Sequence, residues 1–447
     1  MFSSSRSAGT SGLTRSELLQ RGLAAGVAIG TTGALADAAR GSTRASKARY
    51  TSDCSGPFRV RVPWAQVDAL RRRLSATRLP SSELVADASQ GVQLAAAQAL
   101  CGHWATGYDW YAFEASLNAL PQFKTEIDGV GIHFIHVRSA HENALPLIIT
   151  HGWPGSIVEM LGVIGPLTDP TAYGGTADDA FDLVVPSLPG FGFSDAPTAL
   201  GWGPARVAGA WAQLMSSLGY TRYVAQGGDV GAGVTDAMAI QAPAGLAGVH
   251  LNFLRRPPAN ILLALLGLAP VPPLTAAQQA AFTAYAAQLK KGYNAEMSQS
   301  PESIGYSLTD SPVGQAAWML DHDADSYAKI SKAFLGAPPS GGLTPVHILD
   351  NMTLYWLTAT ATSAARMYWE GARETAASLG QPQPVVSLPV GFTVFPDEIY
   401  QAPLSWVQAV YPNLTYFHEA AAGGHFAAWE EPQLFAEELR AAFRPLR

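Results

Sequence analysis

The sequence predicts an α/β protein with a mostly parallel sheet, a helical cap inserted into it and an N-terminal segment that wraps around it. Short apolar runs typical of buried strands alternate with helical stretches between residues 145 and 253, and this pattern resumes at residue 390. From about residue 255 to 374 the sequence is mostly helical in character. Because strands that alternate with helices form parallel sheets covered on both faces, we expect one layered core with an inserted cap.

The predicted elements follow from local patterns. Residues 49–140 are expected to form an N-terminal domain that is helical at first and ends in a hairpin around Asp128 and Gly129. The remaining parts are a first core segment (141–254), the cap (255–374) and a second core segment (375–447). Core strands are expected at residues 145–150, 181–186, 223–225, 248–253, 390–394 and 414–417. Helices are expected at residues 205–218 and 233–241 in the core, at 275–290, 311–320, 326–334 and 348–370 in the cap, and at 430–443.

The composition restricts the classes of function. The chain has 447 residues, of which 48% are hydrophobic and 14% are charged, so it can bury a large core. A net charge of -7 lacks the basic footprint that nucleic-acid-binding proteins carry. Two cysteines, Cys54 and Cys101, are too few for a disulfide framework, and whether they pair is left open. No Cys/His spacing indicates a zinc site.

Residues 1–48 have the layout of a secretory signal. The first part is polar and basic, residues 22–36 are small and apolar, and residues 34–36 form a small-x-small cleavage pattern. The apolar run is too short to span a bilayer. Residues 14–20 resemble a twin-arginine signal in which Ser16 replaces the second arginine, so the export route is left open. We expect an exported protein, with a cytoplasmic protein carrying a disordered tail as the alternative.

The stretch QGGDVG at residues 226–231 indicates where the chemistry lies. A Gly-x-Asp-x-Gly turn between a strand and a helix is typical of a nucleophile elbow, where strained backbone exposes the central side chain. Gly227 and Gly231 leave room for that turn. Asp229 stands where such elbows usually carry serine, which predicts displacement at carbon by a carboxylate. Taken alone, the pattern also fits an ordinary Gly-rich turn with a surface aspartate.

Two later loops supply partners for Asp229. The loop at residues 395–398 follows a strand and offers two acids, Asp397 and Glu398. His425 lies among small residues after the next strand. The order nucleophile, acid, histidine is that of α/β-hydrolases, and loops that follow parallel strands converge at one edge of the sheet.

Two backbone amides are expected to complete the site. The loop HGWPGS at residues 151–156 leaves a strand beside the elbow and can direct the amide of Trp153 towards Asp229. The amide of Val230, directly after Asp229, supplies a second donor. Two such donors form an oxyanion hole. The alternative interpretation of the first loop is a plain turn.

These motifs make the chain resemble the microsomal-type epoxide hydrolases, the α/β-hydrolase branch with an extra N-terminal domain. The resemblance runs from about residue 56 to the C-terminus. It rests on the elbow and on the stretches at residues 57–58, 108–110, 133–136, 151–156, 186–194, 310–314, 395–398, 423–427 and 430–432. It implies that Asp229 is the nucleophile and that His425 and Glu398 form the base pair, with Asp397 ranked second as the acid.

The resemblance also implies two proton-donating tyrosines in the cap, which match Tyr293 and Tyr368. The other tyrosines considered are Tyr285, Tyr306, Tyr327 and Tyr355. Phenols suit this task because a reference pKa of about 10 keeps them protonated at neutral pH. The family usually carries tryptophan directly after the nucleophile, so Val230 implies a wider pocket beside Asp229.

The implied reaction converts a small lipophilic epoxide and water to a vicinal diol through an alkyl ester on Asp229, without cofactor or metal. Detoxification or the catabolism of aromatic hydrocarbons would use such a reaction. We expect no nucleic-acid partner and no stable membrane span, and a homodimer is left open. The alternatives are a haloalkane dehalogenase, which needs donors for a departing halide, another α/β-hydrolase, or a non-catalytic binding protein on this fold.

Overall fold

The computed structural model describes residues 56–447. The predicted signal segment and Cys54 lie outside the described residues, whereas Cys101 is buried and free. No helix in the described part of the chain is long and apolar enough to cross a membrane.

A nine-stranded sheet forms the core, with the order β1-β2-β3-β5-β4-β6-β7-β8-β9. The strands are β1 (Gly56–Pro57), β2 (Gln122–Ile127), β3 (Val130–Val137), β4 (Leu145–Thr150), β5 (Phe181–Pro186), β6 (Tyr223–Gly227), β7 (Leu246–Leu251), β8 (Val390–Val394) and β9 (Leu414–Glu419). The neighbouring strands β5, β4, β6, β7, β8 and β9 run parallel. At one edge β3, β2 and β1 continue the sheet in antiparallel pairs. The predicted mostly parallel sheet is therefore confirmed. β7 begins and ends two residues earlier than the strand expected at residues 248–253.

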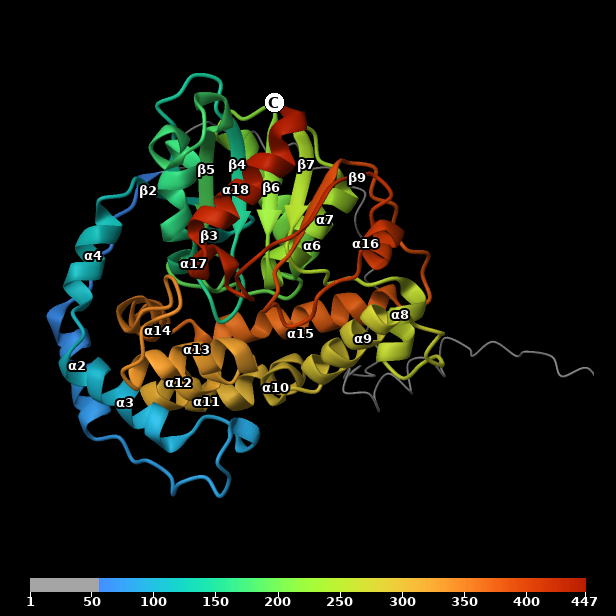
Figure 1. The fold of residues 1–447 in the computed structure, drawn as a ribbon. Helices are drawn as coiled ribbons and strands as arrows, with labels where there is room; N and C mark the ends of the chain where they lie inside the picture. Colours follow the sequence, from blue (N-terminus) through green and yellow to red (C-terminus); the bar gives the residue numbers. More distant parts are fainter. Residues whose placement is uncertain (1–55) are drawn as a thin grey trace, which may run out of the picture.

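Helices cover both faces of the sheet. On one face α18 (Pro432–Phe443) packs against α5 (Ile164–Thr168) and crosses β7, β8 and β9, and it lies in front of the sheet in Figure 1. On the other face α6 (Pro204–Ser217) packs against α7 (Asp229–Gln241), which lies on β4, β6 and β7. The remaining core helices are α16 (Leu404–Val410) and α17 (Ala427–Glu430). Short 3-10 helices lie at Ala88–Gln90, Ile157–Val163, Pro170–Tyr173, Ala177–Asp179 and Arg444–Leu446.

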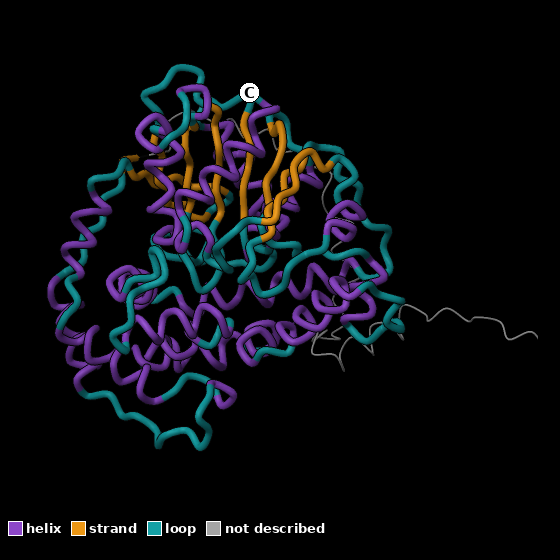
Figure 2. Tube along the Cα trace, viewed as in Figure 1, coloured by secondary structure: helices purple, strands orange, loops and turns teal. Residues whose placement is uncertain are grey.

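The segment between β7 and β8 forms a helical layer below the sheet, seen in purple under the orange strands in Figure 2. Its helices are α8 (Ala259–Leu265), α9 (Ala276–Leu289), α10 (Gly292–Gln299), α11 (Pro301–Asp310), α12 (Pro312–Leu320), α13 (Ala324–Phe334), α14 (Pro345–Thr358) and α15 (Ala361–Ser378). We call this layer the cap.

One cap prediction is wrong, because the single helix expected at residues 348–370 is two helices, α14 and α15. Ala359 adopts a left-handed conformation with φ 52° and ends α14. The hydroxyl of Thr358 donates to the carbonyl oxygen of Leu354 at 2.7 Å, an example of a threonine side chain that competes with the helix backbone. The break ends α14 at Thr358, and α15 begins at Ala361.

The N-terminal segment connects the cap to the sheet edge. Its helices α2 (Trp64–Ser75), α3 (Leu94–Thr106) and α4 (Trp110–Asn118) pack on cap helices, and its strands β1 and β2 extend the sheet. The indole of Trp104 donates to Thr353 at 2.8 Å, and the hydroxyl of Tyr108 donates to Asp350 at 2.8 Å. In Figure 1 this segment descends along one side of the molecule from the sheet to the cap. It therefore fixes the cap over the carboxyl ends of the parallel strands.

Candidate active site

The elbow at residues 226–231 has the strained geometry that its glycines predict. Asp229 follows β6 as the first residue of α7 and has a φ of 46°, a left-handed value that is unfavourable for a side chain other than glycine. A Cβ on Gly227 would lie 2.1 Å from the carbonyl oxygen of Gly231. A Cβ on Gly231 would lie 2.0 Å from the carbonyl oxygen of Thr150. Only glycine fits at either position, so the turn holds the Asp229 carboxylate at the edge of the sheet.

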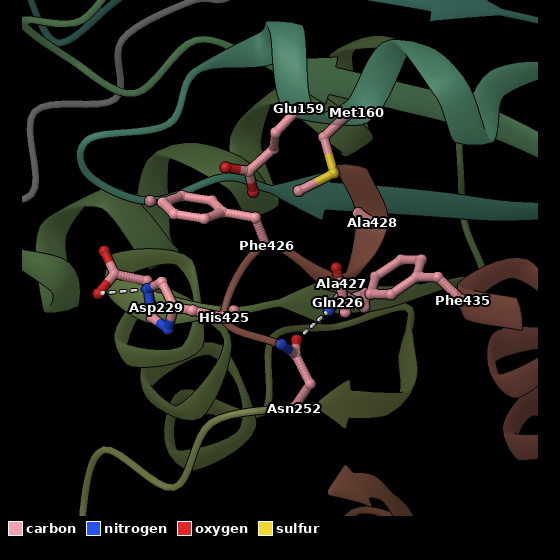
Figure 3. A pocket seen from close by; sticks show the side chains of 12 residues that line it. Glu159, Met160, Gln226, Asp229, Asn252, His425, Phe426, Ala427, Ala428 and Phe435 are labelled. Carbon is pink, nitrogen blue, oxygen red and sulfur yellow. Dashed lines mark hydrogen bonds and ion pairs between the residues drawn. The ribbon is translucent and has the colours of Figure 1, made fainter. Parts of the chain in front are cut away.

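The carboxylate of Asp229 is held from two sides. The amide of Trp153, in the loop after β4, donates to Oδ1 of Asp229 at 2.8 Å. Nε2 of His425, in the loop after β9, lies 3.6 Å from Oδ2 (Figure 3). Burial alone would raise the pKa of Asp229, but the charged imidazole of His425 beside it outweighs that effect and holds the pKa of Asp229 well below its usual range. Asp229 is therefore ionised at neutral pH, as a nucleophile must be.

His425 is oriented by Glu398. Nδ1 of His425 lies 2.6 Å from Oε1 of Glu398, and both side chains are buried. Burial opposes a charged imidazole, but the charges of Glu398 and Asp229 hold the pKa of His425 well above its ordinary value. Asp397, the competing acid, instead forms an ion pair with Lys329 at 3.0 Å and its side chain is 48% exposed. The geometry therefore selects Glu398 as the partner of His425.

Lys329 on α13 connects the cap to the loop that carries Glu398 and to the segment that follows His425. Its ammonium group lies 3.0 Å from Asp397, beside Glu398, and 2.6 Å from Glu430. Glu430 in turn accepts a hydrogen bond of 3.2 Å from the amide of Phe426, directly after His425. One cation on the cap thus links the segments that carry Glu398 and His425.

The two matched tyrosines lie in the cap over Asp229. Tyr293 on α10 is 2% exposed and Tyr368 on α15 is 4% exposed. The ring of Trp153 stacks on Tyr293 at 4.9 Å and meets Tyr368 edge-on at 5.8 Å. Burial, reinforced by the charge of Asp229, raises the pKa of both phenols well above 10, so both stay protonated.

The hydroxyl groups of these two tyrosines are available as donors. The Tyr368 hydroxyl is buried and has no partner in the described part of the chain. The Tyr293 hydroxyl accepts a hydrogen bond from Nε2 of Gln288, which leaves its own hydrogen free to point elsewhere. Both groups can therefore donate to a ligand oxygen.

The other cap tyrosines are engaged or distant. The hydroxyl of Tyr355 donates to the carbonyl oxygen of Gly155 at 2.7 Å, and that of Tyr285 donates to the carbonyl oxygen of Arg255 at 2.9 Å. Tyr327 accepts a hydrogen bond from the N-terminal segment. Tyr306 is 80% exposed on α11. Tyr293 and Tyr368 are thus buried cap tyrosines that interact electrostatically with Asp229 and whose hydroxyl groups donate no hydrogen bond within the described residues.

Comparisons with known proteins identify the family of this chain. Residues 55–160 match the family described as Epoxide hydrolase N terminus, and residues 146–288 match the alpha/beta hydrolase fold. A putative epoxide hydrolase of Stigmatella aurantiaca (strain DW4/3-1) is 50% identical over 396 residues, which cover 88% of this chain and 85% of that protein. The chain belongs to the microsomal-type epoxide hydrolases.

Further relatives agree with this assignment. Epoxide hydrolase 1 of Sus scrofa is 32% identical over 86% of this chain and 87% of its own length. The crystal structure of juvenile hormone epoxide hydrolase from the silkworm Bombyx mori superposes with a TM-score of 0.76, at 31% identity, over 88% of this chain and 95% of that chain. Aspergillus niger epoxide hydrolase gives a TM-score of 0.73 at 31% identity, covering 89% and 97%. The chain is an epoxide hydrolase on an α/β-hydrolase fold, which confirms the family, fold and activity predicted from the sequence.

Four polar residues of this epoxide hydrolase site escaped the sequence analysis. The ring of His322, between α12 and α13, lies 4.7 Å from the ring of His425 and binds Asp323 through Nδ1 at 3.0 Å. The charge of Arg255, after β7, helps to lower the pKa of Asp229. Burial raises the pKa of Glu159 to about 8, so its carboxyl group is neutral at pH 7. The motif Asp-His-Asp at residues 321–323 was the available signal for two of them, but no core motif adjoins it.

A small polar pocket adjoins Asp229 and His425. It is lined by Glu159, Gln226 and Asn252, together with apolar residues such as Phe426 (Figure 3). Nε2 of His425 and Oε1 of Gln226 are buried here without a hydrogen-bond partner in the described residues. The epoxide hydrolase therefore has a small pocket with polar side chains beside Asp229 and His425.

Proposed function

We propose that this epoxide hydrolase acts through an ester on Asp229. The carboxylate attacks an epoxide carbon from behind the breaking C–O bond, while Tyr293 and Tyr368 bind the ring oxygen and protonate it as it becomes an alkoxide. The observation that carries the proposal is a buried, ionised carboxylate 3.6 Å from an imidazole that is itself bound to a second carboxylate.

In the second half of the reaction, His425 acts as the base. It takes a proton from water, and the resulting hydroxide attacks the carbonyl carbon of the ester, which releases the diol and regenerates Asp229. The amides of Trp153 and Val230 stabilise the oxyanion. Trp153 already donates to Asp229 at 2.8 Å, and Val230 lies in the first turn of α7, where amides have no partner within the helix. The small polar pocket has room for the attacking water beside His425.

Formation of the ester also prepares the base. In the free enzyme the charges of Glu398 and Asp229 together raise the pKa of His425. Esterification removes the charge of Asp229, so one of these two causes disappears and the pKa of His425 falls. The imidazole then gives up its proton more readily and becomes competent to accept one from water. The nucleophile therefore controls when the base is active.

The substrate is a small lipophilic epoxide in this proposal. A second pocket between cap and core shares His322 and Phe426 with the site and is lined mainly by apolar side chains. These are Pro154, Met319, Leu320, Ile330, Ile348, Met352 and Trp429. Such a lining favours burial of hydrocarbon, with polar groups only at the reacting end. We further propose that the enzyme is exported and that it detoxifies epoxides or acts in aromatic hydrocarbon catabolism.

Trapping of the ester tests the proposal. The variant His425→Gln keeps the nucleophile and the tyrosines but lacks the base, so incubation with styrene oxide should leave a stable adduct on the peptide that contains Asp229. Intact-protein and peptide mass spectrometry measure that adduct. His418→Gln, on a half-exposed histidine of β9, is the matched control and should turn over without accumulating it. Absence of the adduct in folded His425→Gln would refute a base role limited to the second step.

A further inference from the structure

Three atoms able to bind a metal ion come together at the site from three separate segments. One ligand atom each of Asp229, His322 and His425 lies within 4.8 Å of the other two. Asp229 and His425 are carried by the core, whereas His322 lies in the cap, between α12 and α13. The cluster therefore bridges the cap and the core.

Each of the two imidazoles has a carboxylate as its second partner. Nδ1 of His425 is bound to Glu398 at 2.6 Å, and Nδ1 of His322 is bound to Asp323 at 3.0 Å. Nε2 of both rings is buried and without a hydrogen-bond partner in the described part of the chain. A carboxylate on Nδ1 fixes the ring orientation, favours the tautomer with a free lone pair on Nε2 and makes that nitrogen a stronger ligand. Histidines that bind zinc are supported in this way.

The spacing is close to that of a zinc site. Zn²⁺ holds nitrogen and oxygen ligands about 2.0–2.1 Å away, so neighbouring ligand atoms of a tetrahedral ion are roughly 3.3–3.5 Å apart. Nε2 of His425 lies 3.6 Å from Oδ2 of Asp229. The three ligand atoms lie within 4.8 Å of one another, so His322 must move inwards by about 1.4 Å to reach the same geometry. Its ring is tilted by 36° against that of His425, at a centroid distance of 4.7 Å.

The local charge favours a cation. Three carboxylates, those of Asp229, Glu398 and Asp323, belong to the cluster or support it directly. The guanidinium of Arg255 is a permanent cation that interacts with Asp229. The three carboxylates outnumber this guanidinium, and a divalent ion that binds here replaces any proton held on Nε2 of either histidine.

We propose that Asp229, His322 and His425 bind one zinc ion, which inhibits this epoxide hydrolase reversibly. Two histidines and a carboxylate suit Zn²⁺, whereas Mg²⁺ and Ca²⁺ prefer sites built from oxygen alone. The ion uses the carboxylate oxygen that attacks carbon and the nitrogen that accepts the proton, so zinc and epoxide exclude each other. Binding itself rests on geometry and holds whether or not the catalytic roles proposed for Asp229 and His425 are correct.

Equilibrium dialysis tests binding without substrate. Tag-free protein is dialysed against Zn²⁺ alone, and bound metal is counted by mass spectrometry; one ion per chain is expected. His322→Gln removes a ligand, and Asp323→Asn removes the support of that ligand while keeping a residue able to cap α13. Loss of such a supporting partner weakens metal binding about 10–100-fold, and the loss of the ligand should weaken it at least as much.

The control is a histidine that also has a carboxylate partner but lies elsewhere. Nε2 of His141 is 3.0 Å from Asp169, near the surface. His141→Gln should bind zinc as the parent does. Circular dichroism of each variant checks that the fold is retained.

Inhibition provides the second readout, with each variant compared with its own rate in the absence of zinc. Diol formation by the parent enzyme should be inhibited competitively with respect to epoxide, restored by a chelator, and unaffected by Mg²⁺. The inhibition constant for zinc should rise at least 10-fold in Asp323→Asn. Equal zinc affinity in the parent, His322→Gln and Asp323→Asn, or a larger loss in His141→Gln than in these variants, would overturn the proposal.

Discussion

Replacement of the two cap tyrosines by phenylalanine should affect the first chemical step and leave the second almost intact. A general acid contributes about 10²–10⁴ to the rate of such a step. Tyr293→Phe and Tyr368→Phe should each slow ester formation, but the remaining hydroxyl partly substitutes, so the double variant should lose more than either single variant. Hydrolysis of the ester needs His425 and backbone amides instead, and its rate should change little.

The two single variants should differ in stability. Tyr293→Phe leaves the buried amide of Gln288 without its acceptor, which costs about 1–3 kcal/mol. Tyr368→Phe removes a hydroxyl that has no protein partner in the described residues, so no protein hydrogen bond is lost. The free energy of unfolding should therefore fall in Tyr293→Phe and stay level in Tyr368→Phe. Tyr306→Phe, on an 80% exposed side chain, should change neither rate nor stability.

Rapid-quench single-turnover kinetics, with the ester quantified by mass spectrometry, measures the first step, and denaturant titration measures the stability. The mechanism requires slow ester formation in the double variant. If the folded double variant forms the ester at the parent rate, these tyrosines are not the acids. If ester formation and ester hydrolysis slow equally, their role is structural.

Three further predictions concern the acid, the elbow and the N-terminus. Glu398→Gln removes a charge that raises the pKa of His425, so that pKa should fall and ester hydrolysis should slow strongly. The control variant Asp397→Asn should keep most of the hydrolysis rate. Equal effects of the two substitutions on the pH–rate profiles would contradict the assignment of the acid. Gly231→Ala places a Cβ 2.0 Å from the backbone carbonyl oxygen of Thr150 in β4, so the free energy of unfolding should fall by about 1–3 kcal/mol or more. Unchanged stability in denaturant titrations would disprove the steric argument. N-terminal sequencing of the native protein should find a start after Ala36, and active protein that retains Met1 inside the cell would refute export.

Much of the core could be predicted because its patterns are local. The strand at residues 145–150 was predicted with the observed bounds, since a short apolar run between turn signals has few alternative structures. The elbow followed from glycine spacing, and steric contact at Gly231 shows why that spacing is required. The choice between Asp397 and Glu398 could not be made from position alone, because both follow the same strand. Only the structure shows that Lys329 binds Asp397 while Glu398 reaches His425.

The cap was less predictable because its signals depend on tertiary contacts. The break at Ala359 has no glycine or proline to announce it, and it rests on a left-handed alanine. His322 and His425 are far apart in sequence, so no ligand spacing could indicate that Asp229 and these two rings share a cluster. Zinc patterns are recognisable in sequence when the ligands are near neighbours in the chain, and these come from three distant loops.

A single turnover in ¹⁸O-labelled water tests the ester on Asp229 most directly. With enzyme in excess over styrene oxide, the attacking hydroxide adds to the carboxylate carbon of the ester, so one oxygen from water stays in the enzyme. The account predicts unlabelled diol from this first turnover and one labelled oxygen in the peptide that contains Asp229. Label that enters the first diol while Asp229 stays unlabelled would mean that water attacks the epoxide directly, and it would contradict the mechanism.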